Sequence, residues 1–243
     1  GSHPAFEDVS GGVTFKQAGA NFTGSLLVGH ADSGTLSSAN YNTGVGIGAL
    51  DALTSGINCV ALGYNALTVN TIGALGKATN NQCVAVGDRA LDNVTSGHNN
   101  IALGSESGAK SNWLNWTTES DRLTLGNYDI THSYVKVDWT VGSDIRDKTD
   151  FGTVPHGIDF VKQLNPISYK FRTARGEDTT TGGVKYGFSA QDILALEKAN
   201  GGSNVIIDDE FEEHLNFTNS HLTPILVNAI KELEARVKTL EDA

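Results

Sequence analysis

A short apolar pattern that ends in glycine recurs in the first half of the chain and limits what this half can fold into. One copy is too small to bury its own apolar side chains, so the copies must stack on one another. The closing glycines are 15, 24 and 17 residues apart. We therefore predict a stack of short β-strands joined by glycine turns. The copies are Val45-Gly46-Ile47-Gly48, Val60-Ala61-Leu62-Gly63, Val84-Ala85-Val86-Gly87 and Ile101-Ala102-Leu103-Gly104, and Ala-Leu pairs follow at Ala52-Leu53, Ala66-Leu67 and Ala90-Leu91.

Two architectures fit such a stack. Apolar residues make up 39% of the chain and aromatic residues only 7%, so a stack built by one chain would keep an exposed face. Three chains around a common axis would cover it, because small Ala, Val and Gly residues can meet at a three-fold axis, and closed symmetric assembly is common. We predict a mainly β repeat stem over residues 1–108, trimeric, with intertwined short strands. A monomeric β-solenoid is the alternative.

The two cysteines, Cys59 and Cys83, occupy the same repeat position, each directly before a valine. Metal ligation is one interpretation, but no His or Cys at ligand spacing accompanies them. Because a cysteine behaves as a small buried hydrophobe, we predict stacked core positions with reduced thiols, no metal site and no cofactor. Two cysteines without a secretory context indicate synthesis in a reducing compartment.

The charge balance excludes several classes of protein. The net charge is −11 and no basic stripe is present, so nucleic acid is not an expected partner. No apolar run approaches the roughly 18 residues that a membrane span requires, and no signal-peptide pattern is present. We expect no membrane partner. Gly1-Ser2-His3 resembles a tag remnant and methionine is absent, so we expect a fragment from the C-terminal end of a longer protein.

Residues 109–142 differ from the repeats and are predicted to form a β-rich tip or end-plug. Leu123 and Leu125 alternate with polar residues, and so does the run from Tyr134 to Trp139, so both are predicted strands. Trp113 and Trp116 lie between polar residues. They are candidates for receptor binding, and the alternative is that they plug the end of the stem.

The second half has the pattern of a small α+β unit. A short helix is predicted around Phe160 to Leu164, since Pro166 marks a turn and an alternating strand follows up to Arg172. Next come a polar loop or hairpin at 175–183, a second strand at 186–190, and a helix at 191–198 that Asn200-Gly201-Gly202 ends.

The C-terminus is predicted to be a helix that starts at Thr223, with Pro224 next to it. Its apolar residues follow a heptad spacing. About two heptads are too short to hold chains together alone, but they can align chains already gathered by the preceding domain. Packing onto its own domain is the alternative. The seam consists of Leu226, Ile230, Leu233, Val237 and Leu240.

Composition changes near Gly142-Ser143. The first 142 residues contain 11 acidic and 6 basic side chains, and the remaining 101 contain 17 and 11. A serine that follows glycine and precedes a lysine by five positions, Lys148, is what a self-cleavage site requires. The alternative is a plain loop with solvated charges.

Four motifs in the second half, in order, resemble the C-terminal intramolecular chaperone domain of phage tail spikes and fibres, of the endosialidase type. A related domain occurs in the membrane-bound myelin regulatory factor. The resemblance covers about residues 143–243, and the repeats before it look like the stem of a phage fibre or, less specifically, of a bacterial trimeric adhesin. The motifs are Ser143-Asp144-Ile145-Arg146-Asp147-Lys148, Leu164 to Phe171, Tyr186 to Asp192, and Leu222-Thr223-Pro224 with Asn228 to Leu233.

The resemblance implies a homotrimeric folding aid, in which two further copies of the chain are the partners, that cuts itself away once the stem has folded. It implies a cut between Gly142 and Ser143, with Ser143 as nucleophile and Lys148 as candidate base. The chaperone domain would act in the host cytoplasm, and the fibre would then belong to the virion tail. We therefore divide the chain into the stem (1–108), the tip (109–142) and a small α+β chaperone domain with autoprotease activity and a C-terminal heptad helix (143–243).

The chemistry of these residue types fits that assignment. A serine hydroxyl is a weak nucleophile until a base takes its proton, and a lysine can do so where burial lowers its pKa. Gly142 lacks a Cβ, so its carbonyl can be approached closely and its backbone can be strained. Arg146 or backbone amides are candidates for stabilising the oxyanion. Asp144 either orients a partner or caps the next turn.

Two other functions remain open from the sequence. The first is a purely structural fibre tip that binds a host receptor, either a cell-surface glycan or a protein, and whose chaperone never cuts. The second is a bacterial trimeric adhesin.

Overall fold

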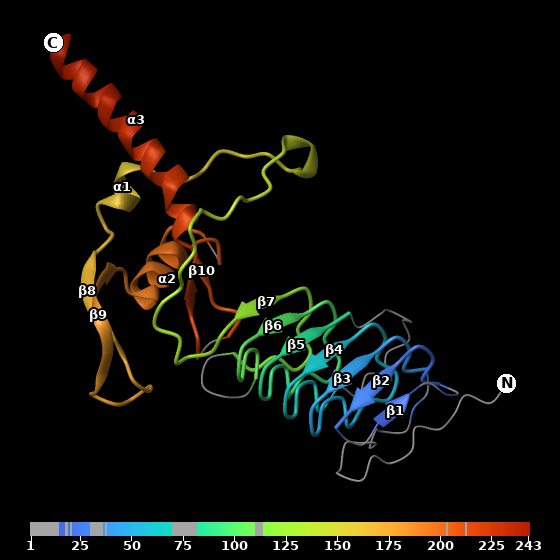
Figure 1. Ribbon diagram of the computed structural model, residues 1–243. Coiled ribbons are helices and arrows are strands. Elements are labelled where there is room, and N and C mark those ends of the chain that lie inside the picture. Colours follow the sequence, from blue (N-terminus) through green and yellow to red (C-terminus); the bar gives the residue numbers. More distant parts are fainter. Residues whose placement is uncertain are drawn as a thin grey trace. The chain divides into compact units, whose positions relative to one another are not determined.

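The structure of the chain is a computed structural model with two compact units, residues 1–130 and 131–243 (Figure 1). Each unit is described by itself below. The structure describes residues 15–17, 19, 21–29, 36, 38–69, 82–109, 114–202, 204–211 and 213–243.

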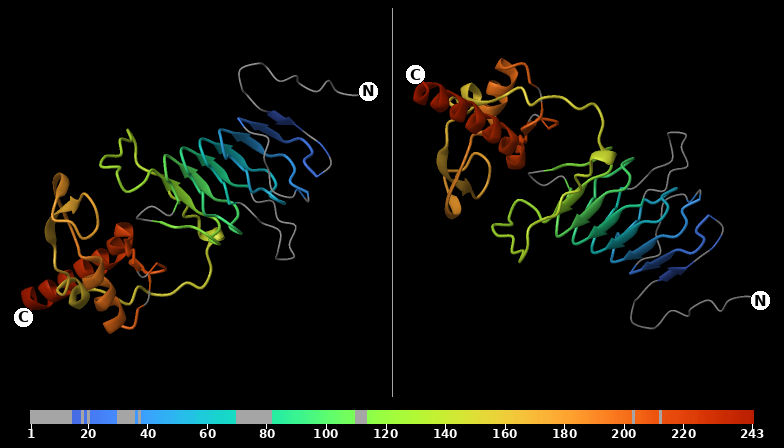
Figure 2. Two further views of the ribbon diagram at one scale, coloured as in Figure 1. Left: turned by 90° about the horizontal axis from the view of Figure 1, so that it is seen from below. Right: turned by 90° about the horizontal axis from the view of Figure 1, so that it is seen from above.

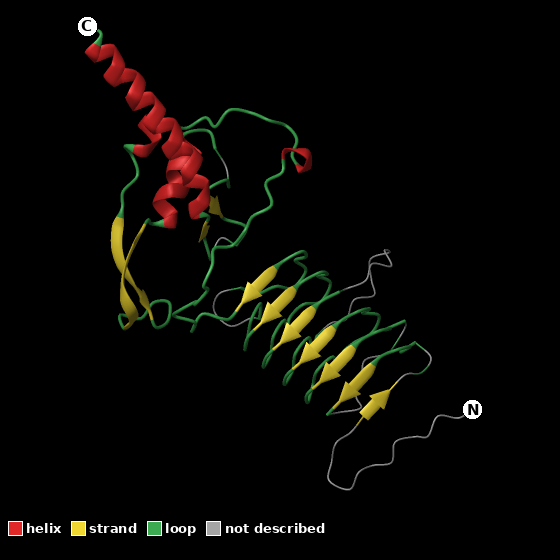
Figure 3. Ribbon diagram, turned by 45° about the horizontal axis from the view of Figure 1, so that its top comes forward, coloured by secondary structure: helices red, strands yellow, loops and turns green. Residues whose placement is uncertain are grey.

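The described residues of the first unit form one seven-stranded sheet in which the strand order follows the chain. The first two strands are antiparallel, and every later strand lies parallel to the one before it. The short arrows therefore form a ladder that is visible from both sides (Figures 2 and 3). The strands are β1 (Phe15–Gln17), β2 (Leu26–Val28), β3 (Thr43–Val45), β4 (Val60–Leu62), β5 (Val84–Val86), β6 (Ile101–Leu103) and β7 (Leu123–Leu125).

A column of glycines directly after the strands sets the stacking distance. Gly63 has φ +136°, and a Cβ placed on it would lie 2.4 Å from the carbonyl oxygen of Gly87. Gly46 stands in the same relation to Gly63. Only glycine permits this backbone conformation and this close approach together.

The register corrects the predicted first repeat. Thr43 pairs with Val60 and Val45 with Leu62, so Gly46, rather than Gly48, belongs to the glycine column. The spacing is then 17, 24 and 17 residues. Two further copies escaped the sequence reasoning, because Leu26–Val28 with Gly29 and Leu123–Leu125 with Gly126 also stack in register.

The interior of the stack is filled by small residues on the strands and by leucines on the turns. Leu50, Leu67 and Leu91 are fully buried, although each has a left-handed backbone with φ between 51° and 60°. Each also donates its backbone N–H to the next coil. The Ala-Leu pair of the first copy is therefore Ala49-Leu50, not Ala52-Leu53. The middle strand residues that point inward are Leu27, Gly44, Ala61, Ala85, Ala102 and Thr124.

A single chain thus forms a parallel β-solenoid. The term solenoid is used below for strands β2–β7 and the turns between them. Its coils pair with coils of the same chain, as in the monomeric alternative, and the intertwining of three chains stays a prediction. The outward strand residues remain apolar and partly exposed. They include Val45, Leu62, Ile101, Leu103, Leu123 and Leu125, which are 37–55% exposed.

The second unit has the α+β content that the sequence predicts. The predicted short helix, the two strands and both longer helices are present, although the second strand starts earlier, at Thr180. Its elements are η1 (Ile145–Asp147), α1 (Ile158–Val161), β8 (Ile167–Arg172), β9 (Thr180–Gly187), α2 (Ala190–Ala199), β10 (Ile207–Asp208), β11 (Asn216–Phe217), η2 (Asn219–His221) and α3 (Leu222–Glu241).

The predicted start of α3 at Thr223 is wrong. The helix begins at Leu222 and its N-cap is His221, which makes no side-chain capping bond. The turn η2 runs directly into α3, so the chain is already helical before Thr223. None of the helices among the described residues is long and apolar enough to cross a membrane.

A small core holds α1, α2, β10 and the start of α3 together. Buried Glu197 on α2 is 1% exposed and accepts backbone N–H bonds from Val205, Ile206 and Ile207 at 2.9–3.2 Å. Three donors satisfy the carboxylate where water cannot reach it. The apolar core consists of Phe160, Ile193, Ile206, Ile207, Leu222 and Ile225.

Residues 131–155, named here the arm, are exposed throughout and contain η1 as their one regular element. The strand predicted from Tyr134 to Trp139 is wrong. No strand of the described chain pairs with this segment, and the side chains of Tyr134 and Trp139 are 90% and 68% exposed. An alternating pattern makes a strand only where a neighbour supplies hydrogen bonds.

Candidate active site

Ser143 and Lys148 are brought together by a single tight turn. The Asp144 carboxylate accepts the backbone N–H of Arg146 at 2.9 Å and so caps the turn. Lys148 closes the turn by donating its N–H to the Ile145 carbonyl at 3.3 Å. The turn places Lys148 Nζ 2.6 Å from Ser143 Oγ. The nucleophile and the candidate base therefore lie within direct hydrogen-bond reach.

Asp144 and Arg146 form an ion pair beside this contact. Arg146 Nε donates to both carboxylate oxygens at 3.0 and 3.1 Å. The side chain of Arg146 lowers the pKa of Asp144, and the carboxylate raises the pKa of Arg146. Of the two roles considered for Asp144, the structure has it capping the turn. The guanidinium of Arg146, a candidate for the oxyanion, is held by that carboxylate.

Gly142 lies in open space. A Cβ placed on it would meet no atom within 4 Å, and its φ is not in the left-handed region. The close approach and backbone strain considered for this residue are therefore not features of the single chain. All residues from 141 to 155 are exposed, and the candidate site is open to water.

Two side chains of α3 anchor the end of the arm and the residues directly after it, and sequence reasoning assigned these two side chains no role. Asn228 donates to the carbonyls of Val154 and His156, both at 3.2 Å. Glu232 accepts the N–H of Ile158 at 2.8 Å. The sequence signal was present, since both residues lie in the motif from Asn228 to Leu233.

The residues of the predicted heptad seam are exposed along α3. Its residues Leu226, Ile230, Leu233, Val237 and Leu240 are 42–77% exposed. The helix instead buries Leu222, Ile225 and Ala229 against its own domain. Different faces of one helix therefore serve the domain core and the seam.

The structure describes only one of the two tryptophans proposed for receptor binding. Trp116 is 3% exposed, and a Cβ on Gly108 would lie 3.0 Å from its ring. Its indole is packed inside the first unit and presents no face to a receptor. Trp113 lies outside the described residues, so its receptor-binding role stays a prediction.

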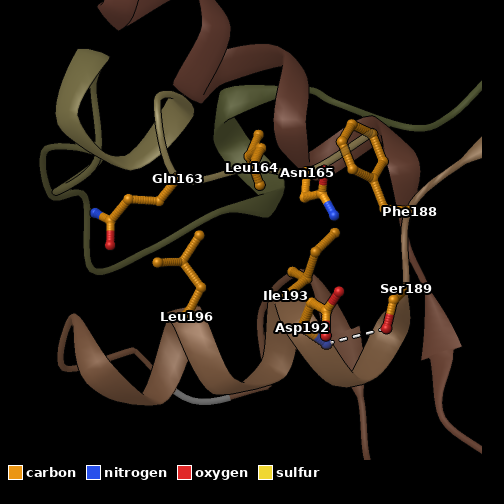
Figure 4. Close-up of a pocket in the computed structure, with 8 residues that line it drawn as sticks. All are labelled: Gln163, Leu164, Asn165, Phe188, Ser189, Asp192, Ile193 and Leu196. Carbon is orange, nitrogen blue, oxygen red and sulfur yellow. Dashed lines mark hydrogen bonds between the residues drawn. The ribbon is translucent and has the colours of Figure 1, made fainter. Parts of the chain in front are cut away.

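A pocket lies between the turn before β8 and helix α2 (Figure 4). Its cavity volume is about 10 Å³, which is room for one water molecule at most. Asp192 N donates to Ser189 Oγ at its edge at 3.2 Å, which is the N-cap bond of α2. This pocket is a packing feature and offers no substrate site.

Residues 143–201 match the model of a family described as chaperone of endosialidase. The match begins at Ser143, the predicted first residue after the cut. No curated protein and no solved structure matches the chain. The predicted resemblance is confirmed for this segment.

Proposed function

Because residues 143–201 belong to the chaperone-of-endosialidase family, we propose that this chain is the C-terminal region of a phage tail fibre or spike. Its chaperone domain, residues 143–243, gathers three chains while the solenoids fold. This domain then releases itself in a single turnover by cutting between Gly142 and Ser143. The observation that carries this proposal is the 2.6 Å contact between Ser143 Oγ and Lys148 Nζ at the first residue of the family match.

The nucleophile belongs to the residue that follows the bond to be cut. Ser143 Oγ attacks the carbonyl carbon of Gly142, and its proton passes to Lys148 Nζ. The C–N bond then breaks. This leaves an ester between Gly142 and Ser143 Oγ and an amino group on Ser143, which takes the proton. Water hydrolyses the ester to a Gly142 carboxylate and restores the Ser143 hydroxyl.

The reaction requires a dry site. A lysine accepts a proton only in its neutral form, and burial favours that form because water stabilises the ammonium. Ser143 and Lys148 are both exposed in the single chain. Covering of the arm by neighbouring copies would remove the water. Assembly before cutting is also the useful order, because a chaperone released too early cannot act.

Three exposed apolar surfaces of the chain support association with further copies. The first is the heptad seam of α3, and the second is the outward face of the solenoid strands. The third is the β8–β9 hairpin, on which Phe171 and Tyr186 are 52% and 87% exposed. A two-stranded hairpin is marginally stable by itself, so packing against another copy would stabilise it.

Cleavage gives the fibre kinetic stability. The chaperone lowers the barrier to folding of the trimer, and its removal raises the barrier to unfolding along the same path. The mature fibre would belong to the virion tail, with a host cell-surface glycan or protein as its target. The second candidate function, a fibre tip or adhesin that is never cut, is favoured by the exposure of the dyad in the single chain.

The test is a denaturing gel and intact mass of the protein beside Ser143→Ala. The parent is expected to give fragments of 142 and 101 residues, and the variant one full-length band. A single band in both would remove the protease function and leave the chaperone function. A monomer at all concentrations in sedimentation would remove the chaperone function as well.

A further inference from the structure

The two cysteines lie on adjacent coils of the solenoid, directly opposite each other. Val60 pairs with Val84 in parallel register, so the residues before them, Cys59 and Cys83, are also aligned. Val60 donates its N–H to the Cys83 carbonyl at 2.9 Å, which continues the ladder to this level. Both side chains are fully buried.

This position forms a column in which side chains tie one coil to the next. Asn42 donates to Gly56 O at 2.7 Å and accepts the N–H of Cys59 at 2.9 Å. Asn100 ties its coil to the next one in the same way, through Glu119 O and the N–H of Arg122. The column therefore has asparagine ties on either side of the two cysteines. A thiol hydrogen bond is weaker than an amide one.

The Cys59 side chain, as a hydrogen-bond partner, lowers the pKa of the Cys83 thiol, while burial raises it. Aligned residues on adjacent strands are about 4.8 Å apart, and disulfides span Cα distances of about 4.4–6.8 Å. The spacing of aligned residues on adjacent coils therefore falls within the Cα range of a disulfide.

We propose that Cys59 and Cys83 are an intramolecular disulfide site, which closes when the folded solenoid leaves the reducing compartment and meets small disulfide oxidants. The bond would supply covalently the tie that asparagine supplies elsewhere in the column. The bond would also bridge the longest interval between successive glycines of the column. This interval is 24 residues, and the intervals before and after it are 17 residues each. The inference concerns the solenoid alone and does not rest on self-cleavage.

The reaction is a thiol–disulfide exchange. One thiolate attacks a sulfur of the small disulfide, forms a mixed disulfide and releases one small thiol. The second thiolate attacks the protein sulfur of the mixed disulfide, closes the Cys59–Cys83 bond and releases a second small thiol. The protein loses two electrons and two protons, and the small disulfide gains them. Because both thiols are buried, the first step waits for local opening of the coils.

The experiment uses the full chain in the Ser143→Ala background, kept reduced, then exposed to glutathione buffers of rising oxidised fraction. One arm exposes the folded protein and the other refolds it from denaturant in the same buffers. Acid-quenched samples are unfolded, alkylated and mapped by mass spectrometry. We expect both titratable thiols to be lost, the chain mass to fall by about 2 Da, and one linked peptide to join Cys59 and Cys83.

The single variants Cys59→Ala and Cys83→Ala are the controls, with folding checked by circular dichroism. Each is expected to keep one thiol or carry one glutathione, and to form no bond within the chain. Refolded protein that retains both thiols in the most oxidising buffer would overturn the proposal. So would disulfides that join different chains only.

Discussion

Lys148 Nζ lies 2.6 Å from Ser143 Oγ, and a turn capped by Asp144 holds the two together. In the usual form of a lysine, this contact is an ammonium that donates a hydrogen bond to the serine hydroxyl. Catalysis needs the reverse, a neutral amine that accepts the serine proton. The same geometry is therefore compatible with a solvated loop and with an active dyad. The protonation state of the Lys148 amine distinguishes the two.

Replacement of the lysine by arginine separates these two roles. In Lys148→Arg the charge and the donor remain, but a guanidinium cannot give up its proton in a protein. We expect the cutting rate to fall at least about 100-fold, as for Lys148→Ala, because general base catalysis supplies about 10²–10⁴-fold. The measurement is the time course of full-length chain on a denaturing gel. Cutting by Lys148→Arg at the parent rate would mean that the lysine only positions the serine.

A charge on the heptad seam is expected to prevent both association and cutting. Ile230 is 65% and Leu233 45% exposed in the single chain, so Ile230→Asp and Leu233→Asp leave the fold of the unit intact. They would place unpaired carboxylates in a helix–helix contact, where burial of a charge is costly. Sedimentation gives the mass and a gel gives the cut. Glu234→Lys, off the seam on the same helix, is the control, and a seam variant that cuts as a monomer would contradict the order proposed here.

The ion pair beside the dyad predicts a pH effect with a definite sign. Arg146 lowers the pKa of Asp144, so the carboxylate's contribution to the capped turn is complete above the ordinary aspartate value of about 3.9. It is lost as the pH falls through the lower pKa of the folded chain. Carbon-detected NMR titration is expected to show Asp144 titrating below its usual range. In Arg146→Gln the value should return towards the usual range, and an unchanged value would mean that the pair does not form in solution.

The sequence was sufficient to predict the repeat, but it did not predict the register of the first copy. Gly46 and Gly48 both follow an apolar residue, and the period alone does not choose between them. The strand register makes the choice, because Val45 pairs with Leu62 and therefore aligns Gly46, not Gly48, with Gly63. The copy at Leu123–Leu125 was predicted as a strand but not as part of the stack, because Thr124 replaces the inward alanine.

The local geometry of the candidate site was predictable from the sequence. Asp144 two residues before Arg146 is a capping pattern, and the capped turn explains why five positions bring serine and lysine together. The exposure of the arm was not predictable, because the spacing of residues carries no information on what covers a segment. The burial of Trp116 likewise depends on Gly108, whose missing side chain leaves room for the ring.

A methyl group in the glycine column is expected to destabilise the solenoid. In Gly63→Ala the new Cβ would lie 2.4 Å from the Gly87 carbonyl oxygen, on a backbone with φ +136°. The backbone conformation alone costs about 1–3 kcal/mol, and separation of the coils would add to this. Thermal unfolding of the Ser143→Ala background measures the change. Gly19→Ala, where a Cβ meets no atom within 4 Å, is the control and is expected to match its parent.

Glu197 is expected to hold the second unit together through its charge-assisted hydrogen bonds. Both carboxylate oxygens accept backbone N–H groups, from Ile206 and from Ile207 at the start of β10, and the side chain is 1% exposed. In Glu197→Gln one oxygen becomes an NH₂ donor that faces an N–H donor, so two buried groups lose their partners. A buried unsatisfied group costs about 1–3 kcal/mol, and urea unfolding of the second unit should show a loss of this size. Glu241→Gln makes the same chemical change at an exposed site of α3 and should leave the midpoint unchanged. Equal midpoints for the two variants would show that solvent, rather than the backbone, satisfies Glu197.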